Sequence, residues 1–184
     1  RRFSTWARWT AERVADRFAR NGRRRGLSDS RLDRHAGAAA SYLAGQKRIV
    51  LENCGEIDPL NIDDYLARDG YRALATCLEN SSSEEIITAI SNSGLRGRGG
   101  AGFPTGRKWA LARAQPVPVK YVICNGDEGD IRAFVGRLVL ESDPHRVLEG
   151  LAIAAYAIGA AEGYLYVRAE RSLAIRHARE AIRQ

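Results

Sequence analysis

The fold is decided by residues 121–167, which read YVICNGDEGDIRAFVGRLVLESDPHRVLEGLAIAAYAIGAAEGYLYV. A short apolar run opens the stretch and predicts a buried strand. A long helix with one apolar stripe follows from Pro144, and then a second strand and a further helix. These four elements are expected at residues 121–124, 145–159, 164–167 and 169–182. Alternating strands and helices predict an α/β layer with parallel strands.

Upstream of this stretch, cap residues divide the chain into short helices. Asn61 can cap one helix, and Ser82 or Ser83 can cap another that ends at Gly94. An apolar triplet between Arg48 and Glu52 predicts a further strand. The expected elements are a strand at 48–52, helices at 62–68, 71–79 and 83–93, and a helical turn at 108–113.

The basic charge of the chain is confined to its first part. Residues 1–45 hold 11 arginines and 4 acidic residues, a net charge of +7, and the remainder is neutral. This favours a basic helical extension over residues 1–47, with helices expected at 3–20 and 28–44, that packs on the body or on a partner. Its acidic residues argue against a mitochondrial presequence, and no nucleic-acid-binding module is recognisable.

The cysteine content and the hydropathy of the chain indicate the cellular compartment in which it works. The chain has three widely spaced cysteines, which we interpret as reduced, mostly buried thiols in a cytosol-like setting. No apolar run approaches the length of a membrane span, since the longest covers residues 151–161. The chain contains no methionine, and we expect that it lacks its natural start.

A loop rich in glycine and arginine over residues 94–107 is the first candidate site. Gly97, Gly99 and Gly102 satisfy G-x-G-x-x-G, but a helix precedes the motif where a dinucleotide-binding turn needs a strand. Glycines let backbone amides approach an anion, a helix starting near Thr105 offers its positive end, and Lys108 adds charge. The loop therefore predicts a phosphate site, against the alternative of a solvated surface loop.

An acidic loop that leaves the strand at residues 121–124 is the second candidate. It holds Asn125, Asp127, Glu128 and Asp130, which could bind magnesium, accept hydrogen bonds from ribose or ribitol hydroxyls, or form a solvated turn. With both loops present, a nucleotide site is the most economical interpretation. The histidines form no ligand pattern, and no metal site is predicted among them.

These segments resemble the NADH-oxidising flavoprotein family. That family includes the FMN subunit of respiratory complex I and the flavin subunits of soluble NAD-linked hydrogenases and formate dehydrogenases. The resemblance covers about residues 48–184 and only the N-terminal part of the family's length. The motifs that carry it are residues 53–59, 93–109, 121–130, 143–150 and 166–170. It implies an incomplete Rossmann-like FMN-binding α/β domain.

The resemblance also implies a set of cofactor contacts and a chemistry. The residues carried over are Gly97, Arg98, Gly99, Gly100 and Lys108 for FMN phosphate and ring, Asn125, Asp127 and Glu128 for the flavin, Asp130 beside nicotinamide and flavin, and Phe103 for the NADH adenine. The implied function is hydride transfer from NADH to FMN, with electrons leaving to an iron–sulfur cluster in the missing C-terminal part or in partner subunits. No side chain is assigned as catalytic, and the expected location is cytoplasmic, directly or through a complex at the inner membrane.

Several positions depart from the family pattern. Ile131-Arg132 stands where Pro-Gly is usual, Gly126 replaces an alanine, Leu111 replaces a possible second adenine-stacking aromatic residue, and Gly136 replaces a frequent acidic residue. Two alternatives stay open: a truncated, flavin-free interaction subunit of such a complex, and a generic nucleotide-binding module.

Overall fold

The computed structural model describes residues 45–130 and 133–184. These residues form two compact units, and the boundary between the units falls inside both strands of the sheet. The first unit comprises residues 71–124 and 149–165, and the second comprises the described parts of 45–70, 125–148 and 166–184. The helices expected at 3–20 and 28–44 lie outside the described residues.

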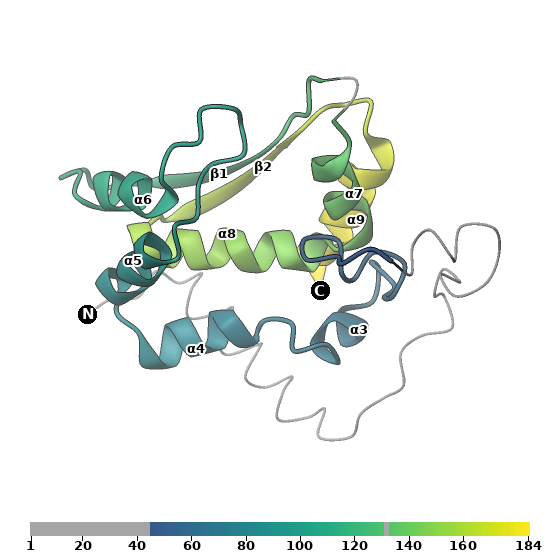
Figure 1. Cartoon of the computed structure of the whole chain (residues 1–184), viewed down its shortest axis with the longest axis horizontal. Coiled ribbons are helices and arrows are strands. Elements are labelled where there is room, and N and C mark those ends of the chain that lie inside the picture. Colours follow the sequence, from purple (N-terminus) through teal and green to yellow (C-terminus); the bar gives the residue numbers. More distant parts are fainter. Residues whose placement is uncertain (1–44, 131–132) are drawn as a thin grey trace. The chain divides into compact units, whose positions relative to one another are not determined.

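A two-stranded parallel sheet carries the α/β character of the chain (Figure 1). Strand β1 covers Tyr121–Gly126 and strand β2 covers Glu162–Val167, which confirms both strand predictions and the α/β fold class. The expectation that β1 is buried along its whole length is wrong. Its residues alternate, so that Val122 packs on the core while Ile123 is 64% exposed. Successive side chains of a strand point to opposite faces, and the described residues cover only one face of this strand.

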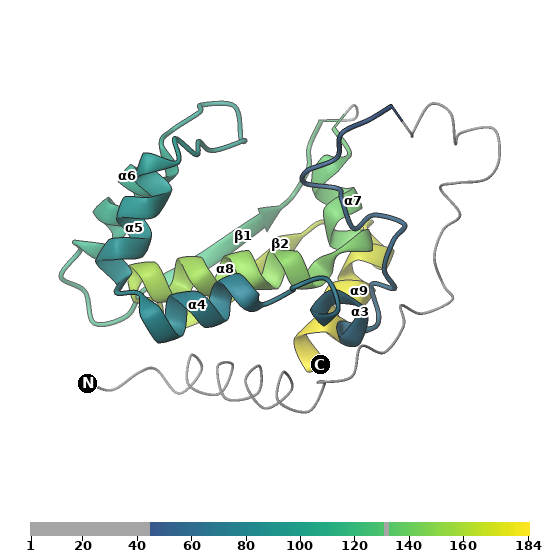
Figure 2. The same cartoon turned by 60° about the horizontal axis from the view of Figure 1, so that its bottom comes forward.

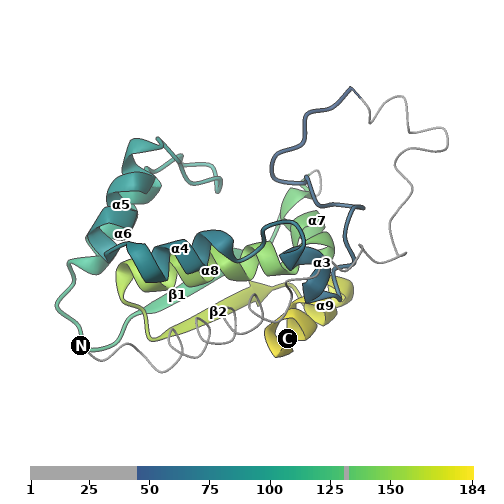
Figure 3. The ribbon, with the colours of Figure 1, turned by 90° about the horizontal axis from the view of Figure 1, so that it is seen from below.

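The described part of the first unit contains α4 (Arg72–Asn80), α5 (Ser83–Asn92), α6 (Thr105–Arg113) and the larger part of α8 (Pro144–Ile158). Helices α4 and α8 run side by side in Figures 2 and 3. Helix α8 is rich in alanine, and its small side chains let α5 approach closely, so that Ile86, Ile87 and Ala157 form one buried cluster. Trp109 of α6 packs against this cluster.

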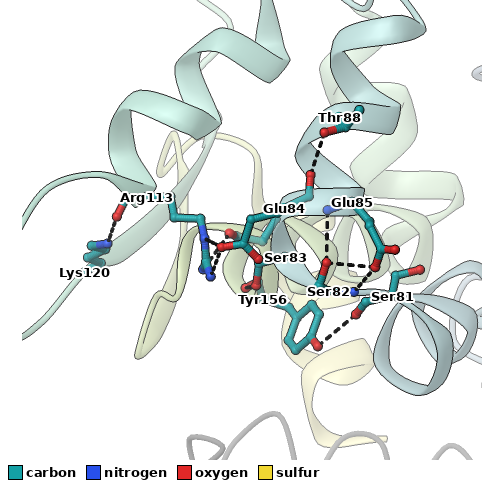
Figure 4. Close-up of polar contacts among 10 residues, drawn as sticks. Ser81, Ser82, Ser83, Glu84, Glu85, Thr88, Arg113, Lys120 and Tyr156 are labelled. Atoms are coloured by element: carbon teal, nitrogen blue, oxygen red, sulfur yellow. Dashed lines mark hydrogen bonds and ion pairs between the residues drawn. The ribbon is translucent and has the colours of Figure 1, made fainter.

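The helices of the first unit differ in how their first turns are capped. Ser82, one of the two cap residues that the sequence offers, forms a capping box with Glu85 at the start of α5 (Figure 4). The start of α4 has no local side-chain cap, and Glu149 of α8 accepts hydrogen bonds from the amides of Tyr71 and Leu74 at 2.9 and 3.0 Å instead. This contact fixes the first turn of α4 against α8.

The second unit contains α3 (Ile62–Leu66), α7 (Val135–Ser142) and α9 (Ser172–Arg183). Asn61 caps α3 as expected, and α7, which the sequence did not predict, packs on α9 (Figure 1). Buried polar groups in this unit have partners. Asn53 donates to the Asp143 carboxylate at 2.8 Å, and His145 stacks on Tyr65 with ring centroids 5.6 Å apart.

Three other expectations need correction. Residues 48–52 form turns and no strand, and Ile49 is 69% exposed, because an apolar triplet can equally lie on a surface turn. The three cysteines are free but only partly buried. Helix α3 ends at Leu66, two residues earlier than expected, before Asp69 takes a positive φ of 59°. In the described part of the chain, no helix combines the length and apolar character needed to cross a membrane.

Candidate functional site

The glycine loop, defined here as residues 97–103, lies in the first unit between α5 and α6. An antiparallel bridge between Arg96 and Pro104 closes its base. The Gly97 amide donates to the Phe103 carbonyl at 2.9 Å, and the Arg96 guanidinium donates to the Gly102 carbonyl at 2.8 Å. The loop is therefore a closed turn held by its own hydrogen bonds and not an extended linker between the two helices.

The backbone of this loop presents unused donors. None of the amides of residues 98–102 donates a hydrogen bond to another described residue. Gly100 and Gly102 have φ of +109° and +61°, which strain side-chain-bearing residues. A Cβ added at Gly99, Gly100 or Gly102 would have nothing within 4 Å, so space around these amides is open. Open space lined by amide donors is the arrangement that fits a phosphate group.

Helix α6 adds positive potential beside the loop. Its N-cap, Pro104, provides no side-chain hydrogen bond, so no side chain competes for the first-turn amides at that position. Lys108 lies in the first turn and is exposed, as is Arg98 in the loop. The Phe103 ring is 43% exposed, and the Arg107 guanidinium carbon lies 5.7 Å from its centroid. This cation–π contact leaves part of the ring accessible for stacking.

Gly106 sets the position of α6, a role that sequence reasoning missed. A Cβ at this position would lie 2.7 Å from both the Cα and the backbone nitrogen of Ser91 in α5. Helices α5 and α6 thus touch through backbone, and this contact fixes the direction in which the glycine loop enters α6.

The acidic loop, residues 125–130, begins in the last two residues of β1 and belongs to the second unit. The Asn125 side-chain oxygen accepts a hydrogen bond from the Asp127 amide at 3.0 Å. The Asp127 carboxylate forms an ion pair with Arg168, which follows β2 directly. The hydrogen bond to Asp127, together with the opposite charge of that carboxylate, raises the pKa of the Arg168 guanidinium.

Glu128 is engaged with a helix terminus. Its two carboxylate oxygens accept hydrogen bonds from the amides of Gly136 at 2.9 Å and Arg137 at 3.2 Å, in the first turn of α7. Phe134, at the N-cap position of α7, offers no side-chain bond, so Glu128 caps the helix from outside it. The Asp130 carbonyl accepts a hydrogen bond from the Ala133 amide at 3.1 Å.

Close packing explains the glycine at the base of this loop. A Cβ at Gly126 would lie 2.9 Å from Leu140 Cδ1 and 3.1 Å from the Tyr166 carbonyl oxygen. The residue that departs from the family's usual alanine is thus tightly enclosed by α7 and β2. Arg168 and α7 were missed as parts of the site. The signals available for them were the arginine within residues 166–170 and the apolar spacing of residues 135–140.

The predicted site residues therefore fall into two groups. Gly97, Arg98, Gly99, Gly100, Phe103 and Lys108 lie in the glycine loop and the first turn of α6, and Asn125, Asp127, Glu128 and Asp130 lie in the acidic loop. The union of both loops in one site stays a prediction. Over the described ranges, no three histidine, cysteine or acidic residues gather in a way that could hold a metal ion.

Comparison with known proteins relates this geometry to a family. Residues 90–184 match the family described as the Nuo51 FMN-binding domain. The chain is 51% identical over 145 residues to the NADP-reducing hydrogenase subunit HndC of Solidesulfovibrio fructosivorans, covering 79% of this chain and 29% of that protein. It is 49% identical over 124 residues to an NADH-quinone oxidoreductase subunit of Aquifex aeolicus, covering 67% and 29%.

A solved structure shows the same similarity. The crystal structure of an NAD+-reducing [NiFe]-hydrogenase in the air-oxidized state aligns with a TM-score of 0.51 and 37% sequence identity. The alignment covers 59% of this chain and 21% of that chain. The chain thus spans less than a third of the length of the relatives it matches.

Proposed function

We propose that this chain, which belongs to the Nuo51 FMN-binding domain family, supplies the FMN- and NADH-binding part of a multisubunit NAD(H)-linked oxidoreductase. The observation that carries the proposal is the glycine loop, which lies inside the matched residues and whose amides 98–102 donate no hydrogen bond to another described residue. Relatives that are oxidoreductase subunits support the class of activity.

The glycine loop would hold the FMN phosphate. Amides of residues 98–102 and the start of α6 donate to phosphate oxygens, and the exposed charges of Arg98 and Lys108 balance the phosphate charge. The exposed Phe103 ring would stack on the adenine of NADH.

The acidic loop would hold the polyol chain and the ring. The Asn125 side-chain NH2 would donate to a hydroxyl, the Asp127 carboxylate would accept from hydroxyl or ring N–H donors, and Asp130 would lie near the nicotinamide. When bound, FMN supplies the capacity to accept a hydride and release electrons singly. The side chains bind and orient, and none of them is assigned a proton transfer.

Electron acceptors lie outside these 184 residues in this proposal. A cubane iron–sulfur cluster takes four cysteine ligands, and the chain has three widely spaced cysteines. Electrons would therefore pass to a cluster in a further part of the protein or in partner subunits. A cytoplasmic site of action, directly or at the face of a membrane complex, completes the proposal.

The test is a titration of residues 1–184 with FMN, followed by quenching of flavin fluorescence. We expect saturable binding that Lys108→Ala weakens by about tenfold, because a charge-assisted contact to phosphate is lost. Lys47→Ala is the matched control, since Lys47 is also exposed and lies outside both loops. Unchanged affinity in Lys108→Ala refutes the phosphate assignment. A folded chain that binds no FMN favours the flavin-free interaction subunit.

A further inference from the structure

We propose that Arg168 is the positioning residue of the acidic loop, which holds the Asp127 carboxylate in the orientation that receives the flavin. The inference rests on the proposed function and adds a residue to the site. It comes from the contacts that fix the acidic loop, all of which lie within the second unit.

The guanidinium spans the loop from Asp127 to Gly129. Arg168 Nε binds Asp127 Oδ1, and a Cβ at Gly129 would lie 3.4 Å from Arg168 Nη2. A side chain at Gly129 would thus already be in contact with the guanidinium, which lies beside the loop at this residue. The contact joins residues 41 apart in sequence, from the end of β2 to the loop that follows β1.

Asp127 differs from Asn125 and Glu128 in the oxygens that the loop contacts leave to a ligand. Both Glu128 oxygens are engaged by α7 amides, and the Asn125 oxygen is engaged by the Asp127 amide. Asp127 Oδ1 is bound by Arg168, whereas Oδ2 accepts no hydrogen bond from another described residue. Arg168 thus fixes Oδ1 of Asp127 and leaves Oδ2 available to a hydroxyl or ring N–H donor.

A charged partner matters most once a ligand covers the loop. An unpaired carboxylate covered by a ring system loses its water at a large free-energy cost, and a bound cation offsets that cost. In the uncovered loop the Arg168 side chain is 44% exposed, so the pair contributes little to stability there. Ligand binding removes this solvent screening, so the pair should affect FMN affinity more than folding.

The experiment is a double-mutant cycle on FMN binding by residues 1–184. The variants are Arg168→Gln, Arg168→Lys, Asp127→Asn and the double variant Arg168→Gln with Asp127→Asn. We expect Arg168→Gln to weaken FMN binding by about tenfold and to shift the visible absorption bands of bound FMN. Arg168→Lys should recover part of the affinity through its charge. Arg183→Gln is the matched control, because it removes an exposed arginine of an ion pair on α9.

The outcomes separate this inference from the proposed function. Loss of affinity on Arg168→Gln that vanishes in the Asp127→Asn background supports the positioning role. Wild-type affinity in Arg168→Gln, or an equal loss in both backgrounds, overturns it while the FMN site stands. An equal loss of FMN affinity in Arg183→Gln would show that the effect comes from net charge, and it would also overturn the positioning role. A wild-type chain that binds no FMN refutes the proposed function and this role together.

Discussion

Replacement of Gly106 by alanine should destabilise the chain, although alanine is the better helix former. The added Cβ would lie 2.7 Å from the Ser91 backbone, which must retreat by about 0.7 Å to reach ordinary contact at 3.4 Å. Overpacking of this kind costs about 1–3 kcal/mol, and the helix propensity of alanine returns at most about 1 kcal/mol. We expect a net loss of about 1–2 kcal/mol, measured by urea unfolding followed by far-UV circular dichroism, and a fall in Tm of about 2–8 °C.

Gly150→Ala is the matched control for this prediction. Gly150 also lies in a helix, α8, but a Cβ there meets nothing within 4 Å. The same substitution should therefore raise stability by up to about 1 kcal/mol through helix propensity alone. The reasoning is refuted if both variants move stability in the same direction. Because Gly106 sets the entry of the glycine loop into α6, Gly106→Ala should also weaken FMN binding, whereas Gly150→Ala should not.

Ser82→Ala should lower the free energy of unfolding by about 1 kcal/mol, because the α5 capping box is lost. Ser81→Ala is the control, and equal urea unfolding midpoints for the two variants would contradict this prediction. Burial raises the pKa of the Cys77 and Cys124 thiols. Both thiols should therefore be alkylated more slowly in the folded chain than in urea at pH 8, which mass spectrometry can follow. Equal alkylation rates in the two conditions would argue against this prediction. Burial also raises the pKa of Asp143, so its protonated form favours the folded state and this contribution is lost as pH rises through the folded pKa. Wild-type stability should accordingly fall relative to Asp143→Asn above about pH 4 in urea unfolding, and a difference that stays constant with pH would disprove this.

Local sequence signals predicted the helix and strand elements well where their cause is local. Ser82 with Glu85, Asn61 before α3, and the glycine that follows α5 act on backbone groups within a few residues, so they can be interpreted from the sequence alone. The expected strand at 48–52 failed because a short apolar run has no periodicity that distinguishes a strand from a turn.

Helix α7 shows a different kind of failure. Its first turn is capped by Glu128, seven residues before Val135, so no local cap residue marks its start in the sequence. The same contact changes the interpretation of Glu128 itself. The flavin contact expected of Glu128 stays a prediction, and such a contact would share oxygens that already accept hydrogen bonds from the helix. Which acidic side chains of the loop remain available is decided by packing, and the sequence does not encode it locally.

The sequence by itself determined the α/β class, the positions of β1 and β2, and the two loops that carry the candidate site, because turn, cap and strand preferences act over a few neighbouring residues. Tertiary structure decided which groups in those loops have partners. Glu149 caps α4 from 75 residues away, Arg168 holds Asp127 from 41 residues away, and Gly106 touches the Ser91 backbone. Such contacts exist only after helices and strands have packed, since packing alone brings distant side chains within hydrogen-bonding distance.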